Sequence, residues 1–154
     1  MTGSDQARNP ISATVPFDED GLHHGHLILP WSRDESAWGT MRIPICVAKN
    51  GDGPTALITG GNHGDEYEGP LAIVDWAHSV DLEHVQGRVI AVPFMNYPAF
   101  KAARRTSPLD GGNMNRIFPG NPKGTVSEKI ADYFQNTLLP MAEFVLDYHS
   151  GGKT

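Results

Sequence analysis

Three short stretches of this sequence carry side chains that can hold a metal ion or a carboxylate. They are Gly60–Glu66, Asn115–Arg116 and Asp147–Gly152. The first contains His63 and Glu66 in an HxxE pattern, and the third contains His149 after an apolar run. Two imidazoles and one carboxylate form the ligand set of catalytic zinc sites that keep a fourth position open. These residue types therefore predict a zinc site made of His63, Glu66 and His149.

The HxxE pattern alone is a weak indication of a metal. Two side chains three residues apart on a tight turn can reach one ion, but His63 can equally cap a helix whose N-terminus favours the charge of Glu66. Glycines flank His63 and follow His149, and they let the backbone come close to a ligand. Asp65 and Asp147 are candidates for orienting a ligand histidine, or else carboxylates satisfied by backbone donors.

The apolar pattern places both histidines just after predicted strands. Buried strands are predicted at 55–59, 88–95 and 144–146, and helices at 66–80, 96–103 and 125–139. The last of these helices begins with the capping box of Thr125 and Glu128. This alternation predicts an α/β fold with a mostly parallel mixed sheet and helices on both faces. Ligands collect at the carboxyl ends of strands in such sheets, where His63 and His149 both fall.

The N-terminal part of the chain carries weaker signals. Residues 1–20 are polar and predict a loose lead-in, so that residues 21–154 form the folded domain. Short strands are predicted at 26–30 and 42–49. The turn residues of 50–54 then predict a hairpin between the strand at 42–49 and the strand at 55–59.

Composition bounds the class of protein. The chain has 154 residues, enough for one domain with a core, and its 39% hydrophobic and 19% charged residues are typical of a soluble globular protein. A net charge of −6 argues against a nucleic-acid partner. The single cysteine, Cys46, fits a reducing compartment. No secretory signal or membrane span is evident, so we expect a cytoplasmic protein.

Two arginines add a second kind of chemistry. Arg116 follows Asn115 in a Gly- and Asn-rich loop, and a guanidinium beside a carboxamide can bind a carboxylate in bidentate fashion. Arg105 precedes the same loop and can polarise a carbonyl group or hold an acyl group. The alternative is that these arginines form surface ion pairs of little energetic value.

The order of these motifs resembles a known family. HxxE, an arginine, Asn-Arg and a strand-end histidine, in that sequence, are similar to the succinylglutamate desuccinylase and aspartoacylase family, which is related to the zinc carboxypeptidases. The stretches 60–70, 106–120 and 147–153 are most similar to the bacterial branch that deacetylates N-acetyl-diaminobutyrate in ectoine breakdown. The resemblance covers nearly the whole chain from about Asn9 onward.

The resemblance implies a role for each candidate. His63, Glu66 and His149 resemble the zinc ligands, Asn115 and Arg116 the pair that holds the substrate carboxylate, and Arg105 the arginine that polarises the carbonyl. The implied reaction is zinc-dependent hydrolysis of the amide bond of a small N-acyl amino acid. The implied fold is zinc carboxypeptidase-like, and a homo-oligomer is possible.

One departure from the family qualifies this expectation. The family's general-base glutamate lies well beyond the third ligand, and no residue after His149 matches it; Glu68 and Glu143 stand at no motif position. We therefore expect a fold that is incomplete at its C-terminus, with residues 21–154 as the N-terminal part of the catalytic domain and an apolar final strand left exposed. The alternatives are a metallocarboxypeptidase, a catalytically dead zinc-binding module, and a structural α/β domain without metal.

Overall fold

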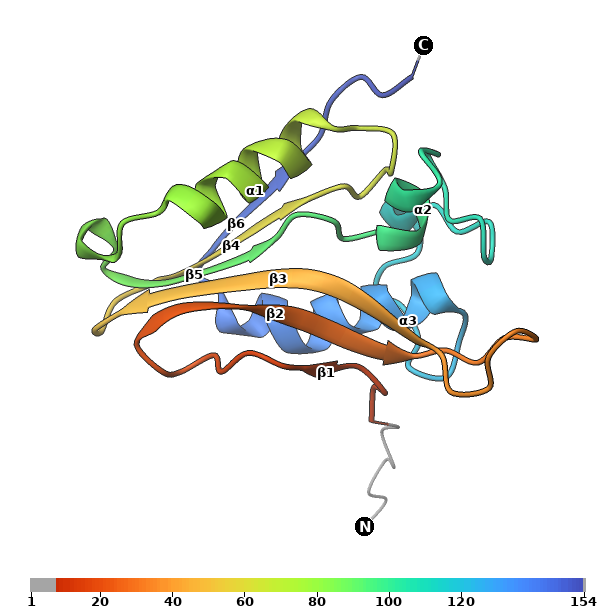
Figure 1. Ribbon diagram of the computed structural model, residues 1–154, viewed down its shortest axis with the longest axis horizontal. Coiled ribbons are helices and arrows are strands. Elements are labelled where there is room, and N and C mark those ends of the chain that lie inside the picture. Colours follow the sequence, from red (N-terminus) through yellow and green to blue (C-terminus); the bar gives the residue numbers. More distant parts are fainter. Residues whose placement is uncertain (1–7, 154) are drawn as a thin grey trace.

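A mixed six-stranded sheet organises the part of the chain that the computed structural model describes, residues 8–153. The strands are β1 (Ser12–Ala13), β2 (Gly21–Pro30), β3 (Thr40–Asn50), β4 (Thr55–Gly60), β5 (Gly87–Val92) and β6 (Phe144–Tyr148). The helices are α1 (Glu68–Ser79), α2 (Tyr97–Lys101) and α3 (Val126–Tyr133). Figure 1 shows α1 and α3 on opposite faces of the sheet, which confirms the expected arrangement. Within residues 8–153, none of the helices is long and apolar enough to cross a bilayer.

The strand order is β1-β2-β3-β5-β4-β6. The pairs β5–β4 and β4–β6 are parallel. The pairs β1–β2, β2–β3 and β3–β5 are antiparallel. The predicted mixed sheet is therefore confirmed, but the parallel pairing that was expected to dominate is confined to three strands. The reason is that β2 and β3 form a long hairpin, with ten paired positions from Gly21 opposite Lys49 to Pro30 opposite Thr40.

The hairpin predicted between β3 and β4 is wrong. Both strands pair with β5, which lies between them, and β3 forms its hairpin with β2 instead. The turn at 50–54 reverses the chain as predicted. However, β4 has buried positions along its length, from Thr55 to Gly60, and therefore needs a neighbour on each side. The chain supplies β5 on one side after the α1 crossover and β6 on the other.

Each face of the sheet carries its own core. On the α3 side, Leu57 and Ile90 of the sheet pack with Ile130, Phe134 and Leu138. These last three recur every four residues, so they share one face of the helical segment, and all are buried. On the α1 side, a smaller cluster contains Cys46, Ile73, Ala77 and Ala91. Burial raises the pKa of the Cys46 thiol to about 11, so this cysteine is an unreactive core residue.

The capping box at the start of α3 is present as predicted. The Thr125 hydroxyl accepts the Glu128 N–H, and the Glu128 carboxylate accepts the Thr125 N–H. After Tyr133 the helix widens into a π-helical turn over Phe134–Leu138 and ends in a 3₁₀ turn that contains Pro140.

The two ends of the described chain differ from their predictions in opposite ways. In the segment expected to be a loose lead-in, β1 pairs with β2, and Ile11 and Val15 are buried in the core; residues 1–7 lie outside the described part. The strand predicted as buried from its apolar residues, β6, is exposed along its length, as was expected for the final strand of an incomplete sheet. It lies at the edge of the sheet, where Phe144 and Val145 are 60% and 50% exposed.

Candidate metal centre

Two neighbouring parallel strands place the candidate ligands side by side. The chain leaves β4 at Gly60 and β6 at Tyr148, and these two residues are direct partners in the sheet. Parallel strands end at the same edge, so the segments that carry His63 and His149 emerge together. The sequence positions of the two histidines, 86 residues apart, are thus joined by the register of one strand pair.

Glycines shape the loop that carries His63 and Glu66. Gly61 has a φ of +65°, a conformation that L side chains rarely adopt. A side chain at Gly64 would meet the backbone of Ala99, with the carbonyl carbon 2.0 Å from the added Cβ. The loop is therefore packed directly against α2, and this packing buries both His63 and Glu66, which are 2% and 3% exposed.

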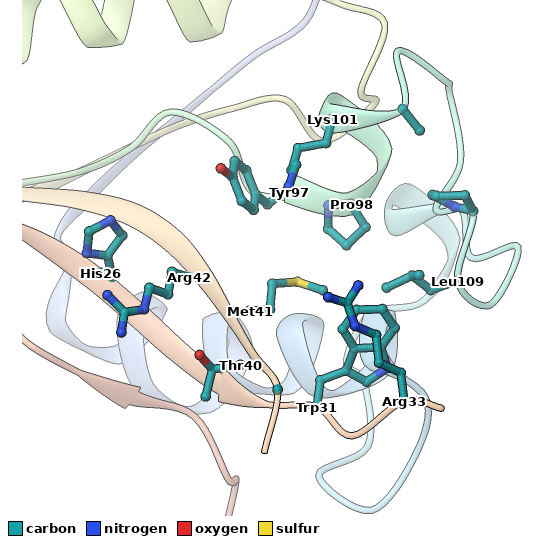
Figure 2. Close-up of a pocket in the computed structure, with 13 residues that line it drawn as sticks. His26, Trp31, Arg33, Thr40, Met41, Arg42, Tyr97, Pro98, Lys101 and Leu109 are labelled. Atoms are coloured by element: carbon teal, nitrogen blue, oxygen red, sulfur yellow. The ribbon is translucent and has the colours of Figure 1, made fainter. Parts of the chain in front are cut away.

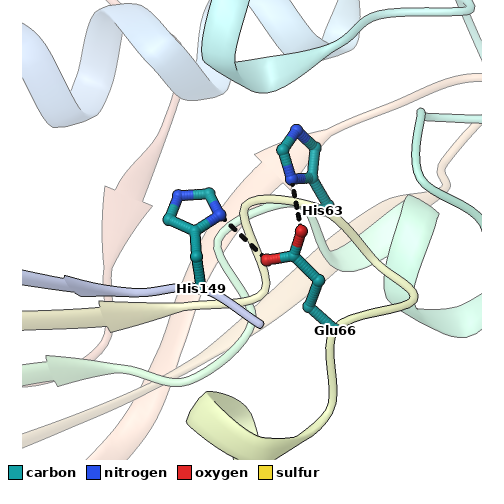
Figure 3. Close-up of side chains that lie close together, drawn as sticks. All are labelled: His63, Glu66 and His149. Atoms are coloured by element: carbon teal, nitrogen blue, oxygen red, sulfur yellow. Dashed lines mark hydrogen bonds and ion pairs between the residues drawn. The ribbon is translucent and has the colours of Figure 1, made fainter. Parts of the chain in front are cut away.

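The three predicted ligands converge on one point (Figure 3). His63 Nδ1 lies 2.7 Å from Glu66 Oε1, and His149 Nδ1 lies 2.8 Å from Glu66 Oε2. One ligand atom from each residue lies within 4.8 Å of the others. The carboxylate thus faces the Nδ1 atoms of both imidazoles at once.

The donor set of this cluster fits a cation. His149 Nε2 lies 3.0 Å from Asp147 Oδ2, and His63 Nε2 lies 3.3 Å from Asn113 Oδ1. Both partners are acceptors, so each Nε2 is assigned the proton, and a neutral imidazole then turns the lone pair of its Nδ1 toward Glu66. The Nδ1 lone pairs of the two imidazoles and the carboxylate of Glu66 repel one another at these distances. Their arrangement is stable only if both imidazoles carry a second proton or if a metal ion lies between the three groups. Two histidines and a glutamate are a ligand set that zinc adopts in catalytic sites.

The carboxylate of Glu66 is held in its charged form. Burial alone would raise its pKa, but the Ser150 N–H at 3.1 Å and the imidazoles of His63 and His149, which donate to the carboxylate when both of their nitrogens are protonated, outweigh burial, so the pKa lies below its ordinary value. A glutamate that stays ionised in a buried position is ready to act as a metal ligand at neutral pH.

The two aspartates proposed as orienting residues behave differently. Asp147 accepts a hydrogen bond from His149 Nε2 and a second one, of 2.8 Å, from the Thr59 hydroxyl. The second bond anchors Asp147 to β4. Asp65 contacts neither imidazole: its Oδ2 accepts the Lys153 N–H at 3.3 Å, and its buried Oδ1 has no partner among the described residues. Asp147 therefore fits the expected role, and Asp65 holds the segment after His149.

Arg105 reaches the cluster from the opposite side. Its Nη1 lies 3.6 Å from Glu66 Oε1, while the side chain remains about half exposed. Its neighbour Arg104 forms no ion pair among residues 8–153. Of the two arginines, the structure therefore brings Arg105 to the metal cluster, with its guanidinium still open to solvent.

Asn115 and Arg116 lie at the rim of the cluster rather than inside it. Both belong to a 3₁₀ turn (Met114–Arg116), and both are exposed. Asn115 Oδ1 lies 3.3 Å from Asn62 Nδ2, and Arg116 Nη1 donates to the Asn115 carbonyl oxygen at 3.2 Å. The guanidinium is thus held against the backbone of Asn115, and both side chains are open to solvent.

Two asparagines next to the ligands were missed in the sequence. Asn113 holds the Nε2 of His63, and its Oδ1 also accepts the Asn115 N–H at 3.2 Å. Asn62 is 2% exposed and donates to both Asn115 and Asp147. Their position inside the same glycine-bounded loops was the available signal.

A larger hollow, of about 610 Å³, lies away from this cluster (Figure 2). It is walled by the end of the β2–β3 hairpin where residues 31–39 connect the two strands, by α2 and by the loop around Leu109. Arg33, Arg42 and Lys101 line it, with Arg33 over the Trp31 ring at 5.4 Å and Lys101 over the Tyr97 ring at 5.7 Å. None of the three candidate ligands lines this hollow.

Comparison with known proteins assigns the chain to a family. The family model for the succinylglutamate desuccinylase/aspartoacylase catalytic domain matches residues 52–154. The N-alpha-acetyl-L-2,4-diaminobutyric acid deacetylase of Halomonas elongata is 62% identical over 149 residues, which are 97% of this chain and 44% of that protein.

Two solved structures are similar over nearly the whole chain. A succinylglutamate desuccinylase from Silicibacter sp. TM1040 is 64% identical, with a TM-score of 0.94 over 96% of this chain and 45% of its own. The product-bound ectoine utilization protein EutE (DoeB) of Ruegeria pomeroyi is also 64% identical, with a TM-score of 0.92 over 94% of this chain and 44% of its own. The chain thus spans less than half the length of each relative. On the strength of the family match and of these identities, the chain belongs to the succinylglutamate desuccinylase/aspartoacylase family.

Proposed function

We propose that this chain carries the metal-binding and carboxylate-binding parts of a zinc-dependent deacylase that hydrolyses the amide bond of a small N-acyl amino acid. The observation that carries the proposal is the convergence of His63, Glu66 and His149 within 4.8 Å, with the far nitrogen of each imidazole held by an acceptor. The 62% identity to a diaminobutyric acid deacetylase supports N-acetyl-diaminobutyrate as the substrate. We further propose the cytoplasm as its location.

Each side chain has a task that its position suits. His63, Glu66 and His149 would hold the zinc ion, which supplies Lewis-acid chemistry toward an amide carbonyl and toward water. Arg105 directs its half-exposed guanidinium toward the same point, where it can donate hydrogen bonds to a carbonyl oxygen that gains negative charge. Asn115 and Arg116 offer amide and guanidinium donors to the carboxylate of the substrate.

The proton transfers of the reaction need a general base, and Glu68 and Glu143, the two glutamates considered from the sequence, are engaged elsewhere. The Glu68 carboxylate accepts the Ser150 hydroxyl, and the Glu143 carboxylate accepts the Thr55 N–H at 2.6 Å. General acid–base help is worth about 10²–10⁴-fold in rate. We therefore propose that the 154-residue chain binds metal and ligand, and that its own turnover is slow.

The test measures metal and turnover on the same preparation. Elemental mass spectrometry of protein purified without chelators or a His-tag should find about one zinc per chain. Hydrolysis is then assayed with N-acetyl-diaminobutyrate and with short peptides. Cleavage of the acetyl amide supports the deacylase, and release of a C-terminal residue from peptides would indicate a metallocarboxypeptidase instead.

Two further outcomes are informative. Zinc bound without turnover on either substrate would favour a zinc-binding module without catalysis. A soluble, folded chain that binds no zinc would contradict the proposed zinc site, and with it the proposed function.

A further inference from the structure

The buried carboxamide of Asn62 is a structural feature that the metal ligands alone do not explain. Asn62 directly precedes His63, and the side chain is 2% exposed. Its Nδ2 donates two hydrogen bonds of 3.3 Å, one to Asn115 Oδ1 and one to Asp147 Oδ2. Its Oδ1 is buried and has no partner among the described residues. A buried acceptor left without a donor disfavours folding, so stability alone does not account for an amide at this position.

The two acceptors fix which way the Asn62 amide points. Asp147 Oδ2 can only accept, because it already lies 3.0 Å from His149 Nε2 as a carboxylate. Its neighbour on Asn62 must therefore be the NH₂ end, and that same NH₂ end faces Asn115. This geometry sets the orientation of the second carboxamide in turn.

We propose that Asn62 is a positioning residue that orients the carboxamide of Asn115 for recognition of the substrate carboxylate. An amide has one donor end and one acceptor end. Because Asn115 Oδ1 is turned to Asn62, its Nδ2 faces away from Asn62 and stays available as a donor, while the guanidinium of Arg116 is held to the Asn115 backbone carbonyl. A carboxylate requires donors on every group that it meets, so the opposite orientation of Asn115 would set oxygen against oxygen. This inference rests on the proposed function of Asn115 and Arg116.

The experiment replaces the donor by an acceptor of the same shape. Asn62→Asp presents carboxylate oxygens to Asn115, whose amide then turns its Nδ2 inward and its Oδ1 toward the ligand. The variant also removes the donor to Asp147 Oδ2, and any resulting loss of zinc affinity should weaken both ligands alike. The affinities of the zinc-loaded chain are measured for N-acetyl-diaminobutyrate and for its neutral carboxamide, in which the α-carboxylate is replaced by CONH₂. We expect the wild-type chain to prefer the carboxylate, and Asn62→Asp to reduce that preference by about 10-fold or more, as for other lost charge-assisted hydrogen bonds. Binding of the neutral carboxamide should change by less than about 3-fold, because an amide accepts either orientation of Asn115.

A matched control separates orientation from charge. Asn121→Asp adds the same charge to the neighbouring loop and keeps the acceptor that holds the Lys123 N–H at 3.0 Å. It should leave the preference for carboxylate unchanged. Zinc content and melting temperature are measured for every variant to verify an intact site.

The outcomes distinguish the inference from the function on which it rests. An unchanged preference in Asn62→Asp, with zinc still bound, would overturn the role of Asn62, as would an equal loss in Asn121→Asp. Equal weakening of both ligands would indicate a merely structural role for Asn62 and would also overturn the inference. A wild-type chain that binds zinc but shows no preference for the carboxylate would instead refute the proposed role of Asn115 and Arg116.

Discussion

The metal cluster and the larger hollow are built in opposite ways. In the cluster, His63 and Glu66 are almost fully buried, and each imidazole is fixed at both of its nitrogens. In the hollow, the cations Arg33, Arg42 and Lys101 are exposed, and two of them rest on aromatic rings. The hollow encloses about 610 Å³, yet none of the three candidate ligands lines it. The difference teaches that fixed, converging ligand atoms identify this site better than empty space does.

Removal of one candidate ligand is the strongest test of this contrast between the two regions. We expect His149→Ala to weaken zinc binding by more than about 100-fold, beyond the range for loss of an outer hydrogen-bond partner. His149 follows an edge strand and is partly exposed, so the fold should survive its loss. Elemental analysis and competition with a chelator measure the effect, with circular dichroism as the control for folding. Retention of one tightly bound zinc would place the metal elsewhere.

The next largest effect concerns the partner behind His149. Asp147 accepts from three donors: the Thr59 hydroxyl, the Asn62 amide and the His149 imidazole. Asp147→Asn keeps the shape but removes the negative charge that the His149 imidazole faces. We expect zinc affinity to fall by about 10-fold, since loss of an outer partner costs about 10–100-fold. Chelator competition measures this, and an unchanged affinity would show that Asp147 does not orient the ligand.

A third prediction concerns the loop that borders both regions. Asp110 accepts the Ser127 N–H at 2.7 Å and the Gly112 N–H at 3.0 Å, and so ties this loop to the first turn of α3. Burial would raise its pKa, but these N–H donors outweigh burial and hold the pKa below the ordinary 3.8. We expect Asp110→Ala to lower the free energy of unfolding at pH 7 by about 1 kcal/mol, as for a lost helix cap.

The pH dependence of that loss follows from the direction of the shift. Because the folded pKa of Asp110 is lower than its unfolded pKa, the stabilisation is complete above the unfolded value and disappears as the pH falls through the folded value. The difference between wild type and Asp110→Ala should therefore be constant from pH 7 to about pH 5 and shrink below about pH 4. Urea unfolding across this range measures it, and a difference that grows in acid would refute the assignment.

The smallest effect is expected in the hollow. Arg42 and Lys101 contact none of the three candidate ligands, and both face solvent. We expect Arg42→Ala and Lys101→Ala each to change zinc affinity by less than about 2-fold, because both charges are exposed and dissolved salt screens them. Calorimetric titration with zinc measures this. A clear change in zinc affinity would mean that the hollow and the candidate metal cluster are energetically coupled, and the two regions would then not be independent.

The proximity of the three candidate ligands was more predictable from sequence than the pairing of the strands that carry them. Histidine and glutamate are distinctive residue types, and His63, Glu66 and His149 all follow the ends of strands. Both the residue type and this position can be recognised in a short stretch of sequence. The α3 capping box is equally local, since Thr125 and Glu128 contact each other. No short stretch of sequence shows which strands pair with β4. Insertion of β5 between β3 and β4 depends on a crossover through α1, which the turn at 50–54 cannot reveal.

The two missed asparagines illustrate a second limit. Asn113 and Asn62 act through one or two hydrogen bonds to residues at least 50 positions away in the chain, apart from the bond of Asn113 to Asn115. An amide in a glycine-rich loop is also the ordinary residue of a turn. Only the folded arrangement separates an asparagine that shapes a turn from one that holds a ligand.

The pairing of β6 with β4 has a consequence for how this part of the protein moves. Glu143 holds the start of the pair, since its N–H donates to the Thr55 carbonyl and its carboxylate accepts the Thr55 N–H. A slip of one residue along β4 would shift His149 by about 3.3 Å and turn the β6 side chains to the opposite face. An ion shared by His63, Glu66 and His149 would therefore act as a cross-link that admits a single alignment of the two strands. Amide hydrogen exchange in β6 should then slow markedly when zinc is added, which makes the edge strand a reporter of metal occupancy.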